Sequence, residues 1–334
     1  MTGRRVWVLV PLLLGAVLVS PLNAYLKFGA ALDNGQVVGL TWTHQPIRYF
    51  VTNRDANGVS ASQLRETLAA SLDQWGKPAN VDLSTQFAGF TNAEPFDEDG
   101  LTVVGFQSHP EFDRTLGATT FVIDNVTGEI LESDIFLNTS FSWSVAQNGQ
   151  AGRFDVGSVL THEVGHLLGL GHSALGETQL TGGGRSVLGK RAVMFPIAFS
   201  PGSIKDRTLE PDDIAGITDI YGNGAARQTL GAIAGRVTLN GSGIFGAHVT
   251  AFNPVTGELV SGFTLTQQGD FVIDALTPGH YIVRVEPLDD ADQDSFFDED
   301  APVATNFRVT YFAQQVAVPA GGASGSIEIK VKAK

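Results

Sequence analysis

The stretch HEVGHLLGLGHS, which begins at His162, constrains this chain more than any other feature. His162 and His166 are four residues apart, so on a helix they rise by about 6 Å and project from one face, where two imidazoles can bind one ion. Glu163 follows the first histidine, and its carboxylate can reach a water on the metal without becoming a ligand. Gly169 tolerates a positive φ, which lets the chain bring His172 back toward the other two. The spacing therefore predicts a catalytic site with three ligands and one open position, typical of zinc.

The extended pattern HExxHxxGxxH, followed downstream by Met194, resembles that of the metzincin metallopeptidases. Ser173, directly after the third histidine, is typical of the matrixin branch. A shorter HExxH would be weak, because histidines on helices are often ordinary core or surface residues, but here every position is filled. The resemblance implies that Glu163 is the general base and that Met194 supports the site from beneath without binding metal. It also implies that one catalytic Zn²⁺ is bound by three histidines, His162, His166 and His172.

Composition limits the remaining choices. A chain of 334 residues is long enough for two domains with separate cores. The formal net charge of -14 disfavours nucleic acid and anionic membranes as partners. The sequence has no cysteine, so it contains no disulfide, no cysteine-bound metal and no thiol nucleophile. Latency through a propeptide cysteine and anchoring through an acylated cysteine are excluded for the same reason.

Residues 1–24 are predicted to be a secretory signal peptide. Arg4 and Arg5 provide a positive start, an apolar run extends from Val6 to Val19, and a small-residue cleavage site ends at Ala24. The run is short for a transmembrane span of about 20 residues. We therefore expect a secreted protein, with a periplasmic location or an uncleaved signal anchor as alternatives. Secretion without cysteine favours a bacterial source.

Residues 25–222 are predicted to form an α+β catalytic domain. A strand is expected at 46–51, a helix from the capping box of Ser60 and Gln63 to Gly76, and further strands at 101–106, 118–123 and 130–137. Asp155 is placed to cap the histidine-bearing helix. This order resembles the upper half of a metzincin domain, a twisted mixed sheet with helices. In that family an edge strand binds extended substrate through its backbone. We assign that role to 130–137, with an ordinary interior strand as the alternative.

Three later segments have expected roles near the site. The glycine-rich segment 181–185 is predicted to be a surface loop that either borders the cleft or, as the sequence slightly favours, is an inert insertion. The resemblance implies that Pro196–Ala198 lines the pocket for the substrate residue after the scissile bond. Leu209–Gly222 is predicted to be a helix, since Pro211 suits its first turn, and in matrixins its adjacent aspartates support the floor of the site.

Additional metal ions are less well supported. Matrix metalloproteinases carry a second, structural zinc and calcium ions, but here the segment 108–113 offers one histidine, His109, and Ile135 stands at the later ligand position. A closed zinc site needs about four ligands. We therefore predict a single zinc and interpret His109 as a loop residue. Calcium stays open.

A small-residue linker is predicted at 223–228, followed by an all-β sandwich at 229–334. Short strand-like runs separated by turn residues resemble carboxypeptidase regulatory-like, transthyretin-like modules, which are structural or binding appendages. His248 and His280 are interpreted as strand or turn residues. The acidic run Asp289–Ser295 is predicted to be a solvated loop, with a weak calcium site as the alternative, because it lacks the central glycine and closing glutamate of a calcium loop.

These patterns together predict a secreted zinc endopeptidase that hydrolyses extended protein or peptide substrates by means of a water on the metal, with Glu163 as base. The alternative is a secreted binding or adhesion protein whose sandwich engages the partner and whose peptidase domain is vestigial. Neither reading predicts nucleic acid as a partner, or membrane beyond the signal peptide. The sequence leaves the oligomeric state unknown.

Overall fold

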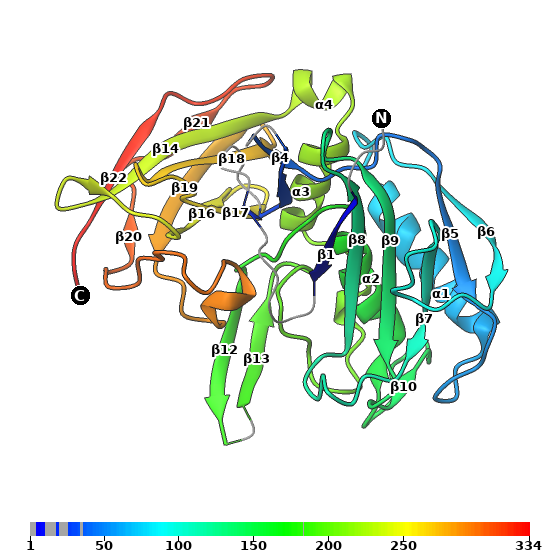
Figure 1. Ribbon diagram of the computed structural model, residues 1–334. Coiled ribbons are helices and arrows are strands. Elements are labelled where there is room, and N and C mark those ends of the chain that lie inside the picture. Colours follow the sequence, from blue (N-terminus) through cyan, green and yellow to red (C-terminus); the bar gives the residue numbers. More distant parts are fainter. Residues whose placement is uncertain (1–4, 11–17, 20–25, 34–35, 183) are drawn as a thin grey trace.

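The computed structural model describes residues 5–10, 18–19, 26–33, 36–182 and 184–334. Two units lie side by side (Figure 1). The N-terminal unit, residues 26–222, contains a large sheet with helices α1 and α2 against it, and the C-terminal unit, residues 223–334, contains two smaller sheets. Among the described residues no helix combines the length and apolar character needed to cross a membrane.

The N-terminal unit has mixed α and β content, as the sequence predicted. Its helices are α1 (Ala61–Gly76), α2 (Val156–Leu167), the 3-10 turn η1 (Lys205–Arg207) and α3 (Pro211–Tyr221). Its strands are β3 (Phe28–Ala31), β4 (Val37–Gly39), β5 (Ile47–Thr52), β6 (Thr85–Thr91), β7 (Thr102–Gln107), β8 (Gly117–Asp124), β9 (Ile130–Asn138), β10 (Trp143–Ser144), β11 (Phe154–Asp155), β12 (Gly176–Thr181) and β13 (Gly184–Lys190).

The main sheet has the strand order β1-β8-β9-β7-β5-β6. Strands β5, β6, β7 and β9 are parallel, and β8 runs antiparallel to β9. The assignment of 130–137 as an edge strand is therefore wrong, because β9 is hydrogen-bonded on both sides and almost fully buried. Among the strands after residue 26, β8 forms this edge. An apolar run alone does not separate a central strand from its neighbour.

Two strands lie within the segment predicted to be a signal peptide. β1 (Arg5–Val10) pairs antiparallel with β8, and β2 (Leu18–Val19) pairs with β3. The rest of that segment, including the predicted cleavage site at Ala24, lies outside the described residues. The signal peptide stays a prediction.

Helix α1 follows from its sequence in the expected way. Ser60 accepts a hydrogen bond from the Gln63 backbone N–H while the Gln63 side chain accepts one from Ser60, which completes the predicted capping box. Trp75, fully buried, donates through Nε1 to the carbonyl of Thr161 on α2 at 2.9 Å. Both helices pack on the same face of the sheet, so this core fixes the position of α2 relative to the strands.

The C-terminal unit is built from two sheets that pack against each other. One has the order β15-β14-β18 with β22 also paired to β14, and the other has β17-β16-β19-β20 with β21 also paired to β19. The elements are β14 (Gly231–Leu239), β15 (Ser242–Gly243), β16 (His248–Phe252), β17 (Leu259–Phe263), β18 (Asp270–Leu276), β19 (Gly279–Glu286), the 3-10 turn η2 (Gln293–Ser295), β20 (Thr310–Tyr311), β21 (Val316–Val318) and β22 (Ile327–Val331).

Side chains from both sheets meet in one cluster, with Ile233 and Ile273 facing Val249 and Val283. This is the layering expected of a sandwich. The likeness to transthyretin-like modules stays a prediction.

The segment between the units differs from the predicted linker. Residues Gly224–Thr229 form a short helix, α4, because the Asn223 side chain accepts hydrogen bonds from the Ala225 and Ala226 N–H groups and caps its start. The units are also packed together, since Ala215 of α3 belongs to the core cluster of the C-terminal unit. The second unit is therefore not a loosely tethered appendage.

Candidate metal centre

Helix α2 carries the first two histidines and the adjacent glutamate. Asp155 caps it, accepting from the Ser158 N–H at 2.7 Å as the sequence predicted, and Arg207 donates to the same carboxylate. All but one residue of the helix are buried, so it is held by the core on several sides. His162 and His166 project from the same side of this rigid element.

The chain then turns at Gly169, whose φ is +99°. A Cβ at this position would lie 2.5 Å from the carbonyl oxygen of Leu40, so glycine is required both for the conformation and for the close approach. The turn is fixed from outside by Phe28, whose N–H donates to the Gly169 carbonyl at 3.0 Å. As predicted, it returns His172 to the other two histidines.

The three imidazoles converge. Their ligand nitrogens all lie within 4.8 Å of one another, and Nε2 of His166 is 3.2 Å from Nε2 of His172. Two nitrogens bound to one tetrahedral zinc at about 2.05 Å are separated by about 3.3 Å. The geometry therefore fits a zinc ion with these three ligands.

Each ring is oriented by a backbone carbonyl that accepts a hydrogen bond from Nδ1. His162 donates to Val193 and His166 to Leu170, both at 2.8 Å, and His172 donates to Ser295 at 2.6 Å. A carbonyl can only accept, so each Nδ1 carries the proton and each Nε2 keeps a lone pair for a metal. Burial lowers the pKa of His166 to about 3 and that of His172 to about 4, and it holds the pKa of His162 well below its usual value. All three rings are thus neutral near pH 7.

The turn around Met194 lies directly beneath the histidines, as the resemblance implied. A Cβ on Gly165 of α2 would collide with the Met194 sulfur, which shows how closely the turn approaches the helix. The buried Asp213 carboxylate accepts hydrogen bonds from the N–H groups of Val193, Met194 and Glu210 at 2.8, 3.1 and 2.9 Å. Since Val193 also provides the acceptor for His162, Asp213 supports a candidate metal ligand through this turn.

Glu163 is 2% exposed and points toward β8. Its Oε2 accepts a hydrogen bond from the Thr119 hydroxyl at 2.8 Å. Burial raises the pKa of the Glu163 carboxyl to about 7, although the Thr119 hydrogen bond acts in the opposite direction. A carboxyl group with a pKa near neutrality can both accept and return a proton.

A cleft of about 320 Å³ opens beside His162 and Glu163. Leu116 and Val159 line it together with the predicted wall Pro196–Ala198. Arg185 of β13 also lines it, so the interpretation of 181–185 as an inert insertion is wrong, and the alternative that it borders the cleft holds. Asp292, Asp294 and Ser295 of the C-terminal unit complete the lining.

The matrixin family model matches residues 41–222, more than half of the chain. The chain belongs to the matrixin family. It is 34% identical to Metalloendoproteinase 5-MMP of Arabidopsis thaliana over 133 residues, which are 36% of this chain and 31% of that protein. It is 37% identical to Metalloendoproteinase 1 of Glycine max over 176 residues, 47% of this chain and 45% of that protein. Metalloendoproteinase 1-MMP of Arabidopsis thaliana is 25% identical over 194 residues, 54% of this chain and 44% of that protein. The chain therefore spans less than half the length of these relatives.

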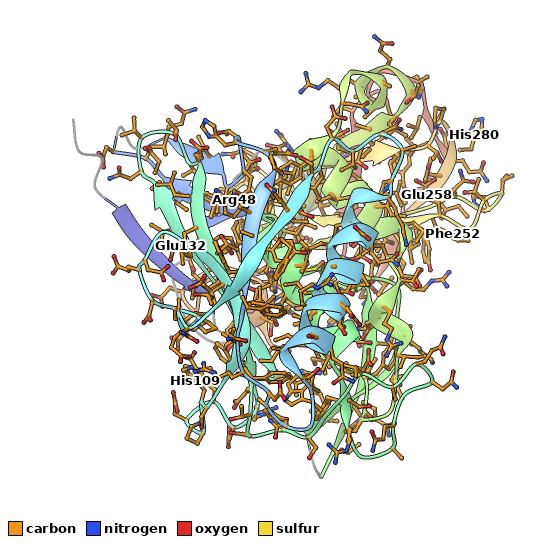
Figure 2. The ribbon with its side chains drawn as sticks, turned by 90° about the vertical axis from the view of Figure 1, so that its right-hand side faces the viewer. Arg48, His109, Glu132, Phe252, Glu258 and His280 are labelled. Atoms are coloured by element: carbon orange, nitrogen blue, oxygen red, sulfur yellow. The ribbon has the colours of Figure 1, made fainter. Side chains whose placement is uncertain are left out.

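Outside the centre, the other candidate metal positions of this matrixin do not assemble. Among the described residues only His162, His166 and His172 form a group of three metal-binding side chains. His109 lies in the loop after β7, where Glu111 and Gln107 engage its two ring nitrogens, each at 2.8 Å. Figure 2 shows His109 and His280 at opposite ends of the molecule. The prediction of a single zinc stays a prediction.

Two contributors to the matrixin site were not predicted from the sequence. Thr119 was predicted only as part of the strand 118–123, although two consecutive threonines, 119 and 120, in a buried strand are a sign of a polar partner. The acidic run Asp289–Ser295 is solvated as predicted, since Asp289, Asp292 and Asp294 are exposed, but the sequence did not indicate that the run also lines the cleft and contacts His172 through a backbone carbonyl. The neighbouring pair Phe296–Phe297 was the available signal, since two aromatic residues are seldom left in solvent.

Proposed function

We propose that this protein is a secreted zinc endopeptidase that hydrolyses peptide bonds of extended protein or peptide substrates. The observation that carries the proposal is the convergence of three neutral imidazoles, each with its Nδ1 engaged and its Nε2 directed inward, beside a buried glutamate. Family membership supports a zinc-dependent metallopeptidase. His162, His166 and His172 would hold the ion.

The chemistry divides between the ion and the protein. When bound, zinc supplies Lewis acidity, which polarises the scissile carbonyl and lowers the pKa of water. Glu163 accepts the proton of the attacking water at its carboxylate and delivers it to the leaving amine nitrogen. Thr119 holds the carboxylate in place through Oε2. No covalent intermediate with the protein is required, because water is the nucleophile.

Substrate would bind in extended form along β8, beside the cleft. Gly117 at the start of this strand has no side chain, whereas a Cβ there would lie 3.2 Å from Oε1 of Glu163. The backbone of an extended peptide would therefore meet no side chain at this position when it adds to β8 as a further strand. β1 occupies part of the edge in the full chain, pairing Val10 with Thr119. Removal of the predicted signal peptide would free it. The apolar wall of Leu116, Val159 and Ile197 would accept a substrate side chain.

The proposal is tested with Glu163→Gln in the full chain. The amide keeps the size of the side chain but cannot act as a base, so we expect zinc binding to persist while kcat falls by about 10²–10⁴-fold. Zinc content is measured by metal analysis, and cleavage is measured on a peptide library. Chelation of zinc should abolish wild-type cleavage, and added zinc should restore it.

The binding-protein alternative predicts a different result. If the zinc-loaded wild type cleaves no peptide in a broad library, and Glu163→Gln is indistinguishable from it, the catalytic proposal is wrong. Glu111→Gln is a suitable control, because this exposed carboxylate also pairs with a histidine but lies away from the cleft. It should retain full activity.

A further inference from the structure

The third histidine differs from the others in where its orienting partner comes from. The Ser295 carbonyl that accepts from His172 Nδ1 at 2.6 Å lies 123 positions later, in the C-terminal unit. It belongs to the turn η2, within the loop 289–297 that follows β19. In Figure 1 this orange segment lies beside the base of the β12–β13 hairpin. A residue outside the matched family region thus contacts a candidate metal ligand.

The loop is held on both sides of this contact, by a ring of the C-terminal unit on one side and by the β12–β13 hairpin of the N-terminal unit on the other. Phe296, 7% exposed, packs its ring on Phe263 at 5.7 Å and near His172 at 6.3 Å between ring centroids. On the other side Thr178 of β12 donates to the Asp290 carbonyl at 2.6 Å. Arg185 donates to Asp292 and to the Asp289 carbonyl. These contacts fix the Ser295 carbonyl at the histidine.

A second tie reaches the residue that follows His172. The Ser173 hydroxyl donates to Oδ2 of Asp212 at 2.6 Å, and the Ser261 N–H of β17 donates to Oδ1 of the same carboxylate at 2.7 Å. Asp212 therefore joins the third-ligand segment to a strand of the C-terminal unit. The two hydrogen bonds to Asp212 are buried, so solvent does not compete with them.

We propose that the loop 289–297 of the C-terminal unit is a positioning element of the metal centre, acting through the Ser295 carbonyl on His172. The C-terminal unit is then part of the catalytic site and not an appendage. This inference rests on the proposed function, since it concerns how His172 is presented to zinc. Hydrogen-bond partners of metal-binding histidines fix ring orientation and basicity, and their loss costs about 10–100-fold in metal affinity.

The test releases the loop in the full chain by Phe296→Ala. A backbone carbonyl cannot be removed by substitution. The variant therefore removes the ring of Phe296, which anchors the chain directly after Ser295. We expect zinc affinity, measured by competition with a chelator, to fall by about 10–100-fold. The visible absorption spectrum of the Co²⁺-substituted protein should also change, since it reports the geometry of the ligands. The conservative variant Phe296→Leu keeps an apolar anchor and should retain both properties.

A matched control separates positioning from general stability. Phe271→Ala truncates an equally buried ring, 3% exposed, in the core of the same unit but away from His172. It should lower the free energy of unfolding and leave the zinc affinity and the Co²⁺ spectrum unchanged. A milder variant, Asp292→Ala, loosens only the exposed ion pair with Arg185 and should lower zinc affinity by about two- to fivefold.

The outcomes distinguish this inference from the proposed function. If the wild type binds zinc and the Phe296→Ala and Asp292→Ala variants bind it equally tightly with the same Co²⁺ spectrum, the positioning role is wrong while the peptidase proposal stands. If Phe271→Ala lowers zinc affinity as much as Phe296→Ala, the effect is general instability and the role is again wrong. A wild type that binds no zinc overturns both proposals.

Discussion

His162 and His166 donate to carbonyls of the N-terminal unit, at Val193 and Leu170, whereas His172 donates to a carbonyl of the C-terminal unit, at Ser295. The first two rings also stand on a buried helix, while the third follows a glycine turn. Two of the proposed ligands are therefore positioned by the region that matches the matrixin family, and the third contacts a second folded unit. The difference shows that a complete ligand motif does not imply a self-contained site.

The same contrast appears in the two neighbouring aspartates of α3. Asp213 faces the N-terminal unit and supports the turn at Met194, while Asp212 faces the C-terminal unit and joins Ser173 to Ser261. Asp213 thus supports the contacts within the N-terminal unit, and Asp212 supports the contact between the two units. Substituting the two aspartates separately tests these two sets of contacts.

Asp213→Ala should have the largest effect. It leaves the buried N–H groups of Val193 and Met194 without their acceptor, each of which costs about 1–3 kcal/mol, and it also removes the acceptor of the part-buried Glu210 N–H. We expect the free energy of unfolding to fall by about 3–5 kcal/mol. Urea unfolding of the metal-free protein measures it. Asp213→Asn keeps one acceptor oxygen and should lose about half as much. A loss below about 1 kcal/mol would show that the turn is held by its apolar packing alone.

Asp212 should make the junction between the units sensitive to pH. Burial, together with the charge of Asp213, raises the pKa of Asp212 to about 7. A carboxyl group whose pKa is raised in the folded state contributes stability that is complete below about pH 4 and is lost as the pH rises through about 7. We expect Asp212→Asn, which stays neutral, to match the wild type at pH 4.5 and to exceed it by about 1–3 kcal/mol at pH 8.

Thermal and urea unfolding at both pH values check this difference. Asp82→Asn makes the same change at an exposed carboxyl group outside the junction and serves as the control. If Asp212→Asn is less stable than the wild type at pH 8, the carboxylate is needed as an anion by Ser173 and Ser261, and the sign of the argument is wrong.

The sequence predicted the parts of the site that depend on local pattern. The histidine spacing, the cap at Asp155 and the turn at Gly169 are each determined by a few neighbouring residues, and the structure has all three. The edge of the sheet was placed on the wrong strand, because strand order depends on pairing between distant segments. Hydrophobicity indicates that both β8 and β9 are buried, but it does not show which of the two lies nearer the edge of the sheet.

The role of the loop 289–297 could not be read from its own residues. Its acidic composition is typical of a solvated surface, and the group that contacts His172 is a backbone carbonyl, which every residue has. Only the packing of the two units brings Ser295 to the centre. The pair Phe296–Phe297 indicated burial but not a partner.

The smallest predicted effect concerns the charge that this loop places at the cleft. Asp294 lines the cleft and is exposed, while Arg185 and Lys190 on the facing hairpin are paired with Asp292 and Asp206. A substrate side chain near the loop therefore meets a negative charge in solvent, and such a contact contributes about 0.2–1 kcal/mol. Asp294→Lys should shift the kcat/KM ratio of lysine- over glutamate-containing peptides by about two- to tenfold toward glutamate. Added salt should reduce the shift.

Glu299→Lys makes the same change on an exposed residue of the following turn, outside the cleft lining, and should leave the ratio unchanged. An equal shift in both variants would mean that net charge acts at long range, and that the C-terminal unit positions the third ligand without selecting the substrate.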